Sequence, residues 1–168
     1  MAIRLQLPNI LLMRSRHESP ISRRKDSFQT LGEELWIADG VRTPYALKRI
    51  LFKAGFRSSL QVHQFKSETN FVLSGEGRFQ IWTEEFDTER FLEGAMPQSE
   101  LDEILNAVLE VEIRAGDIID VKPGRLHRVI AVSDLTFIEA STVELDDVIR
   151  ISDDAQRGHG KIENEHGN

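Results

Sequence analysis

Four side chains in two short segments of this chain could together hold one metal ion. Gln61, His63 and Glu68 lie within the glycine-bounded segment GFRSSLQVHQFKSETNFVLSG, and His127 ends a second run, GDIIDVKPGRLH. Imidazole nitrogens and carboxylate oxygens bind zinc, iron, manganese or nickel, and an amide oxygen is a weaker, neutral ligand. Taken singly, His63 could be a hydrogen-bonded interior histidine and Glu68 a solvated turn residue. The four together, at this spacing, indicate a metal site.

Strand geometry explains how these residues could meet. Side chains alternate between the two faces of a strand, so Gln61 and His63 would point the same way. Glu68 would follow after the chain reverses, and His127 would come from a later strand. Because Glu68 would be the only charged protein ligand, a divalent ion would stay electrophilic enough to polarise a carbonyl or hydroxyl group.

Short segments rich in Val, Ile, Leu and Phe dominate the middle of the chain. Turn signals such as SGEG, AGD and PG separate most of them. Many short strands at this spacing are typical of a sandwich or a barrel, and a closed barrel offers an interior pocket. We predict strands at 46–53, 59–65, 69–73, 77–83, 110–114, 117–122, 127–132 and 135–140.

One segment between the two metal-site runs breaks this pattern. After Pro97, Ser99 is a candidate N-cap, with Asp102 at the third helical position. An apolar stripe with helical spacing follows, which predicts a helix at about 99–110 inside an insertion at 84–110. We expect this helix to pack against the barrel, although it could act as a lid. The stripe consists of Leu101, Ile104, Leu105 and Val108.

Length and composition limit the possible functions. With 168 residues, the chain is long enough for one domain with a substantial core. The net charge of −7 gives little support for binding nucleic acid. There are no cysteines, which excludes disulfides, thiolate metal ligands and thiol nucleophiles. Any bound metal must therefore be held by nitrogen and oxygen atoms.

The ends of the chain differ in composition from the middle. Residues 1–33 form an arginine-rich N-terminal extension, 34–151 the β domain, and 152–168 a polar tail that includes His159 and His166. No apolar run approaches the roughly 20 residues that span a bilayer, and Pro8 interrupts the apolar patch near the N-terminus. We expect no signal peptide, no membrane contact and a cytoplasmic location.

The segment LKRILFKAGFRSSLQVHQFKSE, followed by VLSGEG, resembles the cupin domain of type II mannose-6-phosphate isomerases. The downstream run ELDDVIRISDDAQRG is similar to the acidic ending of that family, and the resemblance covers roughly residues 34–158. It implies an all-β fold, the cupin barrel (double-stranded β-helix, or jelly roll), with a short helical insertion between two cupin motifs. The matching positions are Lys48, Arg49, Ile50, Ser59, Leu60, Gln61, His63, Glu68, His127 and Arg128.

The sequence departs from the usual pattern at several positions. Gln61 replaces the first histidine of the common His-x-His pair, as it does in type I mannose-6-phosphate isomerases, which bind zinc. Phe65 stands where type II cupins often have a further histidine. In the second motif the proline is Pro123, one position late, with Lys122 in its place, and Ala131 replaces the usual asparagine.

The resemblance implies a metal-dependent sugar-phosphate isomerase, with one divalent ion, zinc first and iron, manganese or nickel as alternatives. Gln61, His63, Glu68 and His127 would be the metal ligands. An aldose-ketose isomerase also needs a group that moves a proton, for which Lys48, Lys66 and Glu139 are candidates. A sugar phosphate needs cationic anchors, and motif position suggests Arg128, Lys122 and Arg150. Arg150 could instead form a structural ion pair.

Two other functions stay open at this point. His63, Glu68 and His127 would also make the two-histidine, one-carboxylate triad of non-haem iron oxygenases. The same barrel could bind a sugar or another metabolite without catalysis, since one fold hosts many roles. We expect the partner to be a small molecule, which the isomerase interpretation makes an anionic sugar. We also expect a homodimer, because an exposed sheet edge invites pairing.

Overall fold

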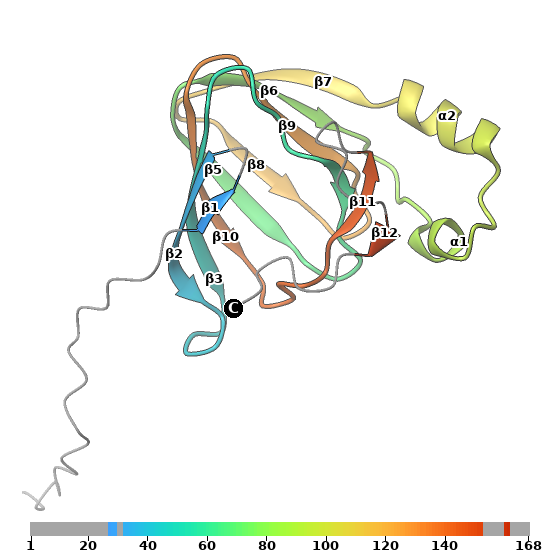
Figure 1. The fold of residues 1–168 in the computed structure, drawn as a ribbon, viewed down its shortest axis with the longest axis horizontal. Coiled ribbons are helices and arrows are strands. Elements are labelled where there is room, and N and C mark those ends of the chain that lie inside the picture. Colours follow the sequence, from blue (N-terminus) through green and yellow to red (C-terminus); the bar gives the residue numbers. More distant parts are fainter. Residues whose placement is uncertain (1–26, 30–31, 153–159, 162–168) are drawn as a thin grey trace, which may run out of the picture.

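The computed structural model describes residues 27–29, 32–152 and 160–161. These residues form two six-stranded antiparallel sheets that face each other (Figure 1). Sheet A has the order β1 (Ser27–Gln29), β2 (Gly32–Asp39), β3 (Ala46–Phe52), β10 (Leu135–Ser141), β5 (Glu68–Ser74), β8 (Ile118–Val121). Sheet B has the order β12 (Gly160–Lys161), β11 (Ile149–Ser152), β4 (Leu60–Val62), β9 (His127–Ala131), β6 (Glu76–Ile81), β7 (Leu109–Arg114).

The apolar core fills one end of the space between the sheets. Phe137 of β10 and Val72 of β5 are completely buried, and the rings of Phe52 and Phe137 meet edge to face with centroids 6.1 Å apart. Sheet B contributes Phe79 and Val129, which face each other across β6 and β9. Burial of these apolar side chains is the main force that holds the two sheets together.

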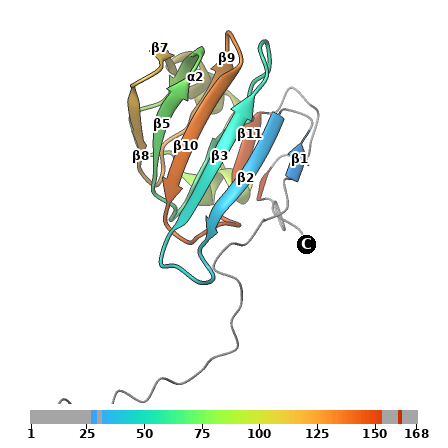
Figure 2. The ribbon, with the colours of Figure 1, turned by 90° about the vertical axis from the view of Figure 1, so that its left-hand side faces the viewer.

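The all-β prediction is confirmed, and each of the eight predicted strands overlaps an observed one. The observed strands β3 to β10 differ from the predicted bounds by a few residues at most. Sequence reasoning missed β1, β2, β11 and β12, which extend the two sheets on one side (Figure 2). β1 and the start of β2 lie within the range 1–33 of the expected extension, and β12 lies within the range of the expected tail. The other residues of that extension and tail fall outside the described ranges, apart from Ser152.

The insertion at 84–110 contains two helices rather than one. α1 (Thr88–Leu92) was not predicted, and Asp87 caps it by accepting a hydrogen bond from the backbone N–H of Arg90. α2 (Gln98–Asn106) starts one residue earlier than expected and ends four residues earlier, so Val108 lies outside it. The predicted Ser99 cap is wrong, since Pro97 occupies the N-cap position and makes no side-chain cap bond.

Both helices pack on the outer face of sheet B. Leu60 and Val62 of β4 point outward there, with Ile149 and Ile151 of β11, and meet the apolar side of the insertion. The helices lie beside β11 at one side of the barrel (Figure 1). The expected packing role is therefore observed. The insertion's contacting residues are Phe86, Phe91, Met96, Leu101, Ile104 and Leu105, and Trp82 just before the insertion joins them. No helix in the described part of the chain has the length and apolar character needed to cross a bilayer.

Gly75 turns the chain from β5 into β6 and should resist substitution. Its φ is +89°, and a Cβ atom there would lie 2.2 Å from the carbonyl oxygen of Asp134. At Gly55, φ is +83° but no atom lies within 4 Å of the added Cβ. Gly55→Ala should lower the free energy of unfolding by about 1–2 kcal/mol, the cost of the left-handed backbone. Gly75→Ala should cost clearly more, because backbone must also move, and urea unfolding of both variants would measure the difference. Equal losses would contradict the close approach.

Candidate metal centre

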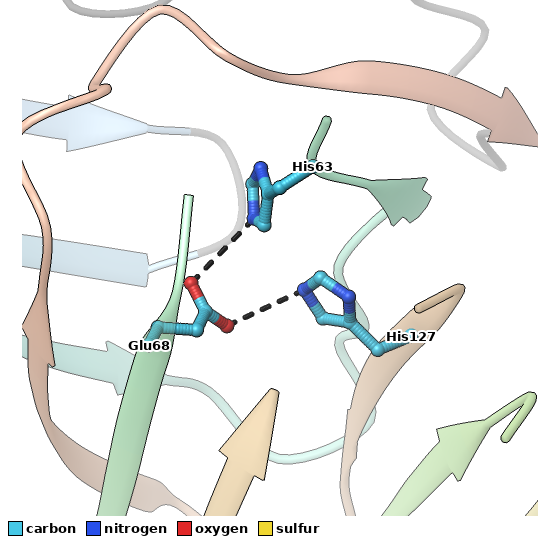
Figure 3. A group of neighbouring side chains, drawn as sticks. All are labelled: His63, Glu68 and His127. Carbon is cyan, nitrogen blue, oxygen red and sulfur yellow. Dashed lines mark ion pairs between the residues drawn. The ribbon is translucent and has the colours of Figure 1, made fainter. Parts of the chain in front are cut away.

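Three side chains from three different strand regions meet in the barrel interior. His63 directly follows β4, Glu68 begins β5 and His127 begins β9, and all three are buried. Nε2 of His63 lies 3.5 Å from Oε2 of Glu68, and Nε2 of His127 lies 3.4 Å from Oε1 of the same carboxylate (Figure 3). The candidate ligand atoms all lie within 4.8 Å of one another. Both sheets thus supply donors to one point.

The hydrogen bonds behind the two imidazoles fix which nitrogen faces the carboxylate. Nδ1 of His63 contacts the carbonyl oxygen of Asp147, and Nδ1 of His127 lies 3.0 Å from the carbonyl oxygen of Arg125. A carbonyl accepts but cannot donate, so each Nδ1 must carry the hydrogen. Each Nε2 then presents a lone pair toward a carboxylate oxygen, and among the described residues Nε2 of His63 meets no hydrogen-bond donor. Facing acceptors in a buried site are the arrangement that a cation resolves, so these residues fit a metal ion.

Gln61 lies beside these three residues but turns its amide nitrogen to them. Gln61 pairs with His127 across β4 and β9, and its Nε2 lies 3.5 Å from Nε2 of His127. Its amide oxygen accepts a hydrogen bond of 2.9 Å from the hydroxyl of Ser59. Rotating the amide by half a turn would direct the oxygen to the centre, and the amide nitrogen would then donate to the Ser59 hydroxyl in place of the present bond. Gln61 as a metal ligand therefore stays a prediction.

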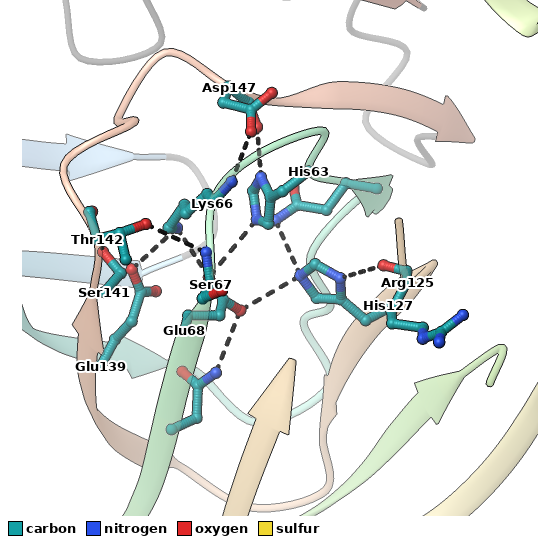
Figure 4. A network of polar contacts seen from close by, with 12 residues as sticks. His63, Lys66, Ser67, Glu68, Arg125, His127, Glu139, Ser141, Thr142 and Asp147 are labelled. Atoms are coloured by element: carbon teal, nitrogen blue, oxygen red, sulfur yellow. Dashed lines mark hydrogen bonds and ion pairs between the residues drawn. The ribbon is translucent and has the colours of Figure 1, made fainter. Parts of the chain in front are cut away.

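A chain of alternating charges continues from Glu68 through the barrel interior. Nζ of Lys66 lies 2.7 Å from Glu68 and 3.1 Å from Glu139 (Figure 4). Nζ of Lys48 lies 3.5 Å from Glu139 and 3.0 Å from Glu34. All five side chains are buried. Burying a charge is costly unless it is paired, and here every charge has an opposite partner.

The pairing sets the protonation states of this network. Burial alone would raise the pKa of the Glu68 carboxyl, but the Lys66 ammonium 2.7 Å away holds it well below its ordinary value. Burial would likewise raise the pKa of Glu139, yet Lys48 and Lys66 keep it below its ordinary value. For Lys66, burial lowers the pKa, and the attraction of Glu139 and Glu68 more than reverses this. The carboxylates stay charged, and Lys66 keeps its proton.

Of the three predicted proton-shuttle residues, two contact the metal-site group directly or through one residue. Lys66 contacts Glu68, and Glu139 is one ammonium group further away. Lys48 is more distant, held between Glu34 and Glu139 with its ammonium 4.2 Å from the ring centre of Trp36. The structure thus distinguishes three residues that the sequence left equal.

The three predicted substrate anchors lie in different places. Arg150 pairs with Gln61 across β11 and β4, so both point to the same face of sheet B. Arg128 follows His127 in β9 and points to the opposite, outer face, where its guanidinium donates to the carbonyl oxygen of Ser152. Lys122 is exposed and lines a pocket of about 400 Å³ together with Glu68 and Ser141. Only Arg150 therefore faces inward beside Gln61.

Several residues of the site were missed by sequence reasoning. Asp147 bonds the segment between His63 and Glu68, and Asn70 donates a 3.2 Å hydrogen bond to Oε1 of Glu68. Glu34 ends the charge chain. Asn70 lies two residues after Glu68 on one strand, so strand alternation could have found it. Asp147 and Glu34 reach the site through tertiary contacts that no local spacing encodes.

Comparison with known proteins rests on structure. No protein-family model matches this sequence, and no curated protein matches it. Among solved structures, an oxalate decarboxylase of Bacillus subtilis with Mn(II) centres matches with a TM-score of 0.56 and 15% identity over 76% of this chain. The capsular polysaccharide assembling protein CapF of Staphylococcus aureus matches with 0.56 and 15% over 80%, and KdgF of Halomonas sp. with 0.51 and 13% over 74%.

These neighbours are cupin-fold proteins. The fold is a cupin barrel. The chain spans about a third of the length of the oxalate decarboxylase and CapF chains, at 30% and 33%, and 90% of the KdgF chain. Identities of this size establish the fold alone, so the similarity to mannose-6-phosphate isomerases stays an inference from sequence. The candidate ligands nevertheless come from the two predicted cupin motifs.

His127→Ala should abolish stoichiometric metal binding. It removes one of the two imidazole ligands. Only Glu68 and His63 then remain of the three candidate ligands, which are too few for a stable site. Elemental mass spectrometry of purified protein should find about one metal ion per chain in the wild type and far less in the variant. His159→Ala, which changes a histidine outside both motifs, is the matched control. Equal metal content in His127→Ala and wild type would refute the site.

Proposed function

We propose that this cupin is a metal-dependent aldose-ketose isomerase of an anionic sugar, with zinc as its ion. The observation that carries the proposal is the position of the Lys66–Glu139 pair beside the three candidate ligands. Isomerisation needs an electrophile at the sugar oxygens and a group that moves a proton between neighbouring carbons. The barrel interior offers metal ligands that could hold the electrophile and a carboxylate, Glu139, that could move the proton. Lys66 contacts both Glu139 and the candidate ligand Glu68.

The protonation states rank the candidates for proton transfer. When bound, the metal would supply a Lewis acid that polarises the substrate carbonyl. Glu139, held as a carboxylate, would take the proton from the carbon next to the carbonyl and return it to the former carbonyl carbon, while the proton of the neighbouring hydroxyl would pass to the former carbonyl oxygen. Lys66 retains its proton and would instead donate hydrogen bonds to the sugar oxygen on which negative charge develops. Lys48 would keep Glu139 ionised and in place.

The charge of the interior favours an anionic substrate. The carboxylates of Glu34, Glu68 and Glu139 and the ammonium groups of Lys48 and Lys66 together carry a charge of −1. A divalent ion would make it +1, which a negatively charged group of the substrate would balance. Arg150, on the inner side of β11, is the anchor that strand register supports for such a group.

Glu139→Gln separates catalysis from metal binding. The variant keeps the shape of the side chain but removes the base, so kcat should fall by about 10²–10⁴-fold while metal content stays near one ion per chain. Turnover of mannose 6-phosphate to fructose 6-phosphate, followed by NMR, would measure it. Glu112→Gln, an exposed position on β7, is the matched control. Unchanged kcat in Glu139→Gln would eliminate it as the base.

Metal analysis and oxygen uptake, measured beside sugar turnover, distinguish the main alternative. The arrangement of His63, Glu68 and His127, with the amide oxygen of Gln61 bonded elsewhere, is also the donor set of non-haem iron oxygenases. Iron in the purified protein, oxygen uptake and no sugar turnover would replace the isomerase with an oxygenase. A bound ion without either activity would indicate a binding protein.

We also propose a homodimer that pairs through the outer face of sheet A. Phe71 and Ile118 face each other across β5 and β8 and are 38% and 67% exposed, and Leu73 on the same face of β5 is 50% exposed. The helices lie on the far side of the barrel from this sheet (Figure 2). Light scattering should give about twice the chain mass of 19.2 kDa, and Ile118→Glu should shift it toward one chain. A monomeric wild type would rule out this pairing.

A further inference from the structure

The segment that connects His63 to Glu68 is held by one loop from elsewhere in the chain. This loop runs from β10 to β11, and Asp147 lies in it. The carboxylate of Asp147 accepts hydrogen bonds from the backbone N–H groups of Gln64, Phe65 and Lys66 at 3.0, 2.5 and 2.8 Å. Figure 4 shows Asp147 beside His63 and Lys66. Three successive backbone donors thus converge on a single side chain.

The next backbone N–H is held by the same loop. Ser67 donates to the hydroxyl of Thr142 at 3.2 Å, and Thr142 donates its own N–H to the carbonyl oxygen of Ser67 at 3.0 Å. Every backbone N–H between the two candidate ligands therefore has a partner at 142–147. The segment between His63 and Glu68 cannot shift without breaking several of these bonds.

Asp147 also contacts a candidate ligand directly. Its backbone carbonyl accepts the hydrogen of Nδ1 of His63, which turns Nε2 toward Glu68. Its side chain fixes where that carbonyl lies, because the carboxylate and the carbonyl belong to one residue. One residue thus sets both the spacing of His63 from Glu68 and the tautomer of His63.

We propose that Asp147 is a positioning residue of the metal centre. It would hold His63 and Glu68 at the separation that metal binding requires, and it would hold His63 in the tautomer with a free Nε2. This inference rests on the metal binding in the proposed function but not on the isomerase reaction. A carboxylate is required because both of its oxygens accept, whereas an asparagine would bring an N–H₂ group against a backbone N–H.

Asp147→Asn and its neighbour Asp146→Asn give a matched test. Both change the charge of the loop equally, but Asp146 is exposed and forms no described bond to the segment. Zinc affinity, measured by competition with a chromophoric chelator, should fall about 10–100-fold in Asp147→Asn and stay unchanged in Asp146→Asn. Asp147→Glu keeps the charge but moves the oxygens, so it should also bind zinc more weakly. It carries the same test if Asp147→Asn does not fold.

A second readout works on the protein without metal. Nitrogen-15 NMR should find His63 protonated at Nδ1 in the wild type and in Asp146→Asn, and a mixture of tautomers in Asp147→Asn. If the wild type binds no zinc, the proposed function fails, and the NMR comparison alone decides the role of Asp147. Zinc affinity within twofold of the wild type in folded Asp147 variants, or an unchanged His63 tautomer, would overturn the inference.

Discussion

The contact of one carboxylate with two imidazoles and one ammonium group is the constraint on which the site depends. Glu68 is buried, and it stays charged because Lys66 lies 2.7 Å away. Both imidazoles turn their lone pairs toward it, since their other nitrogens are bound to carbonyl oxygens. The two imidazole lone pairs and the carboxylate oxygens then face one another, which is the arrangement that a metal ion would resolve. The positions of β4, β5 and β9 can be understood as the means of bringing these groups together.

The barrel interior has two unlike parts. Aromatic and aliphatic side chains such as Phe79, Val72 and Phe137 fill one, while the candidate ligands and the charge chain fill the other. The ring of Phe79 stacks on His127 with centroids 6.1 Å apart, so the two parts touch at a ligand. Tight apolar packing on one side limits the motion of the imidazole. A site that must keep several charges out of water benefits from such a rigid support, because every misplaced partner exposes an uncompensated charge.

The sequence predicted the middle of the fold well because its local signals agree with the tertiary structure. Strand segments with turn signals gave β3 to β10, and spacing within strands placed Gln61 and His63 on one face. Prediction failed where the signal was short or lay in a polar context. α1 has five residues, too few for a helical period, and β11 lies in an acidic run. Arg128 shows a different limit of prediction. Its role came from motif position, although alternation along β9 already places it on the face opposite His127.

Strand β4 joins two parts of the molecule. Gln61 points to the candidate centre, while Leu60 and Val62 pack against the α1 and α2 insertion on the other side. Because β4 contacts both neighbours, the free energy of ion binding on one face and the free energy of helix packing on the other would be coupled. A bound ion that orders β4 would stabilise the packing of the helices against it. Loosening the helix pair would in turn lower the affinity for the ion by the same coupling energy. The helical insertion, far from the chemistry, would thereby become a place where evolution could adjust metal affinity without changing a ligand.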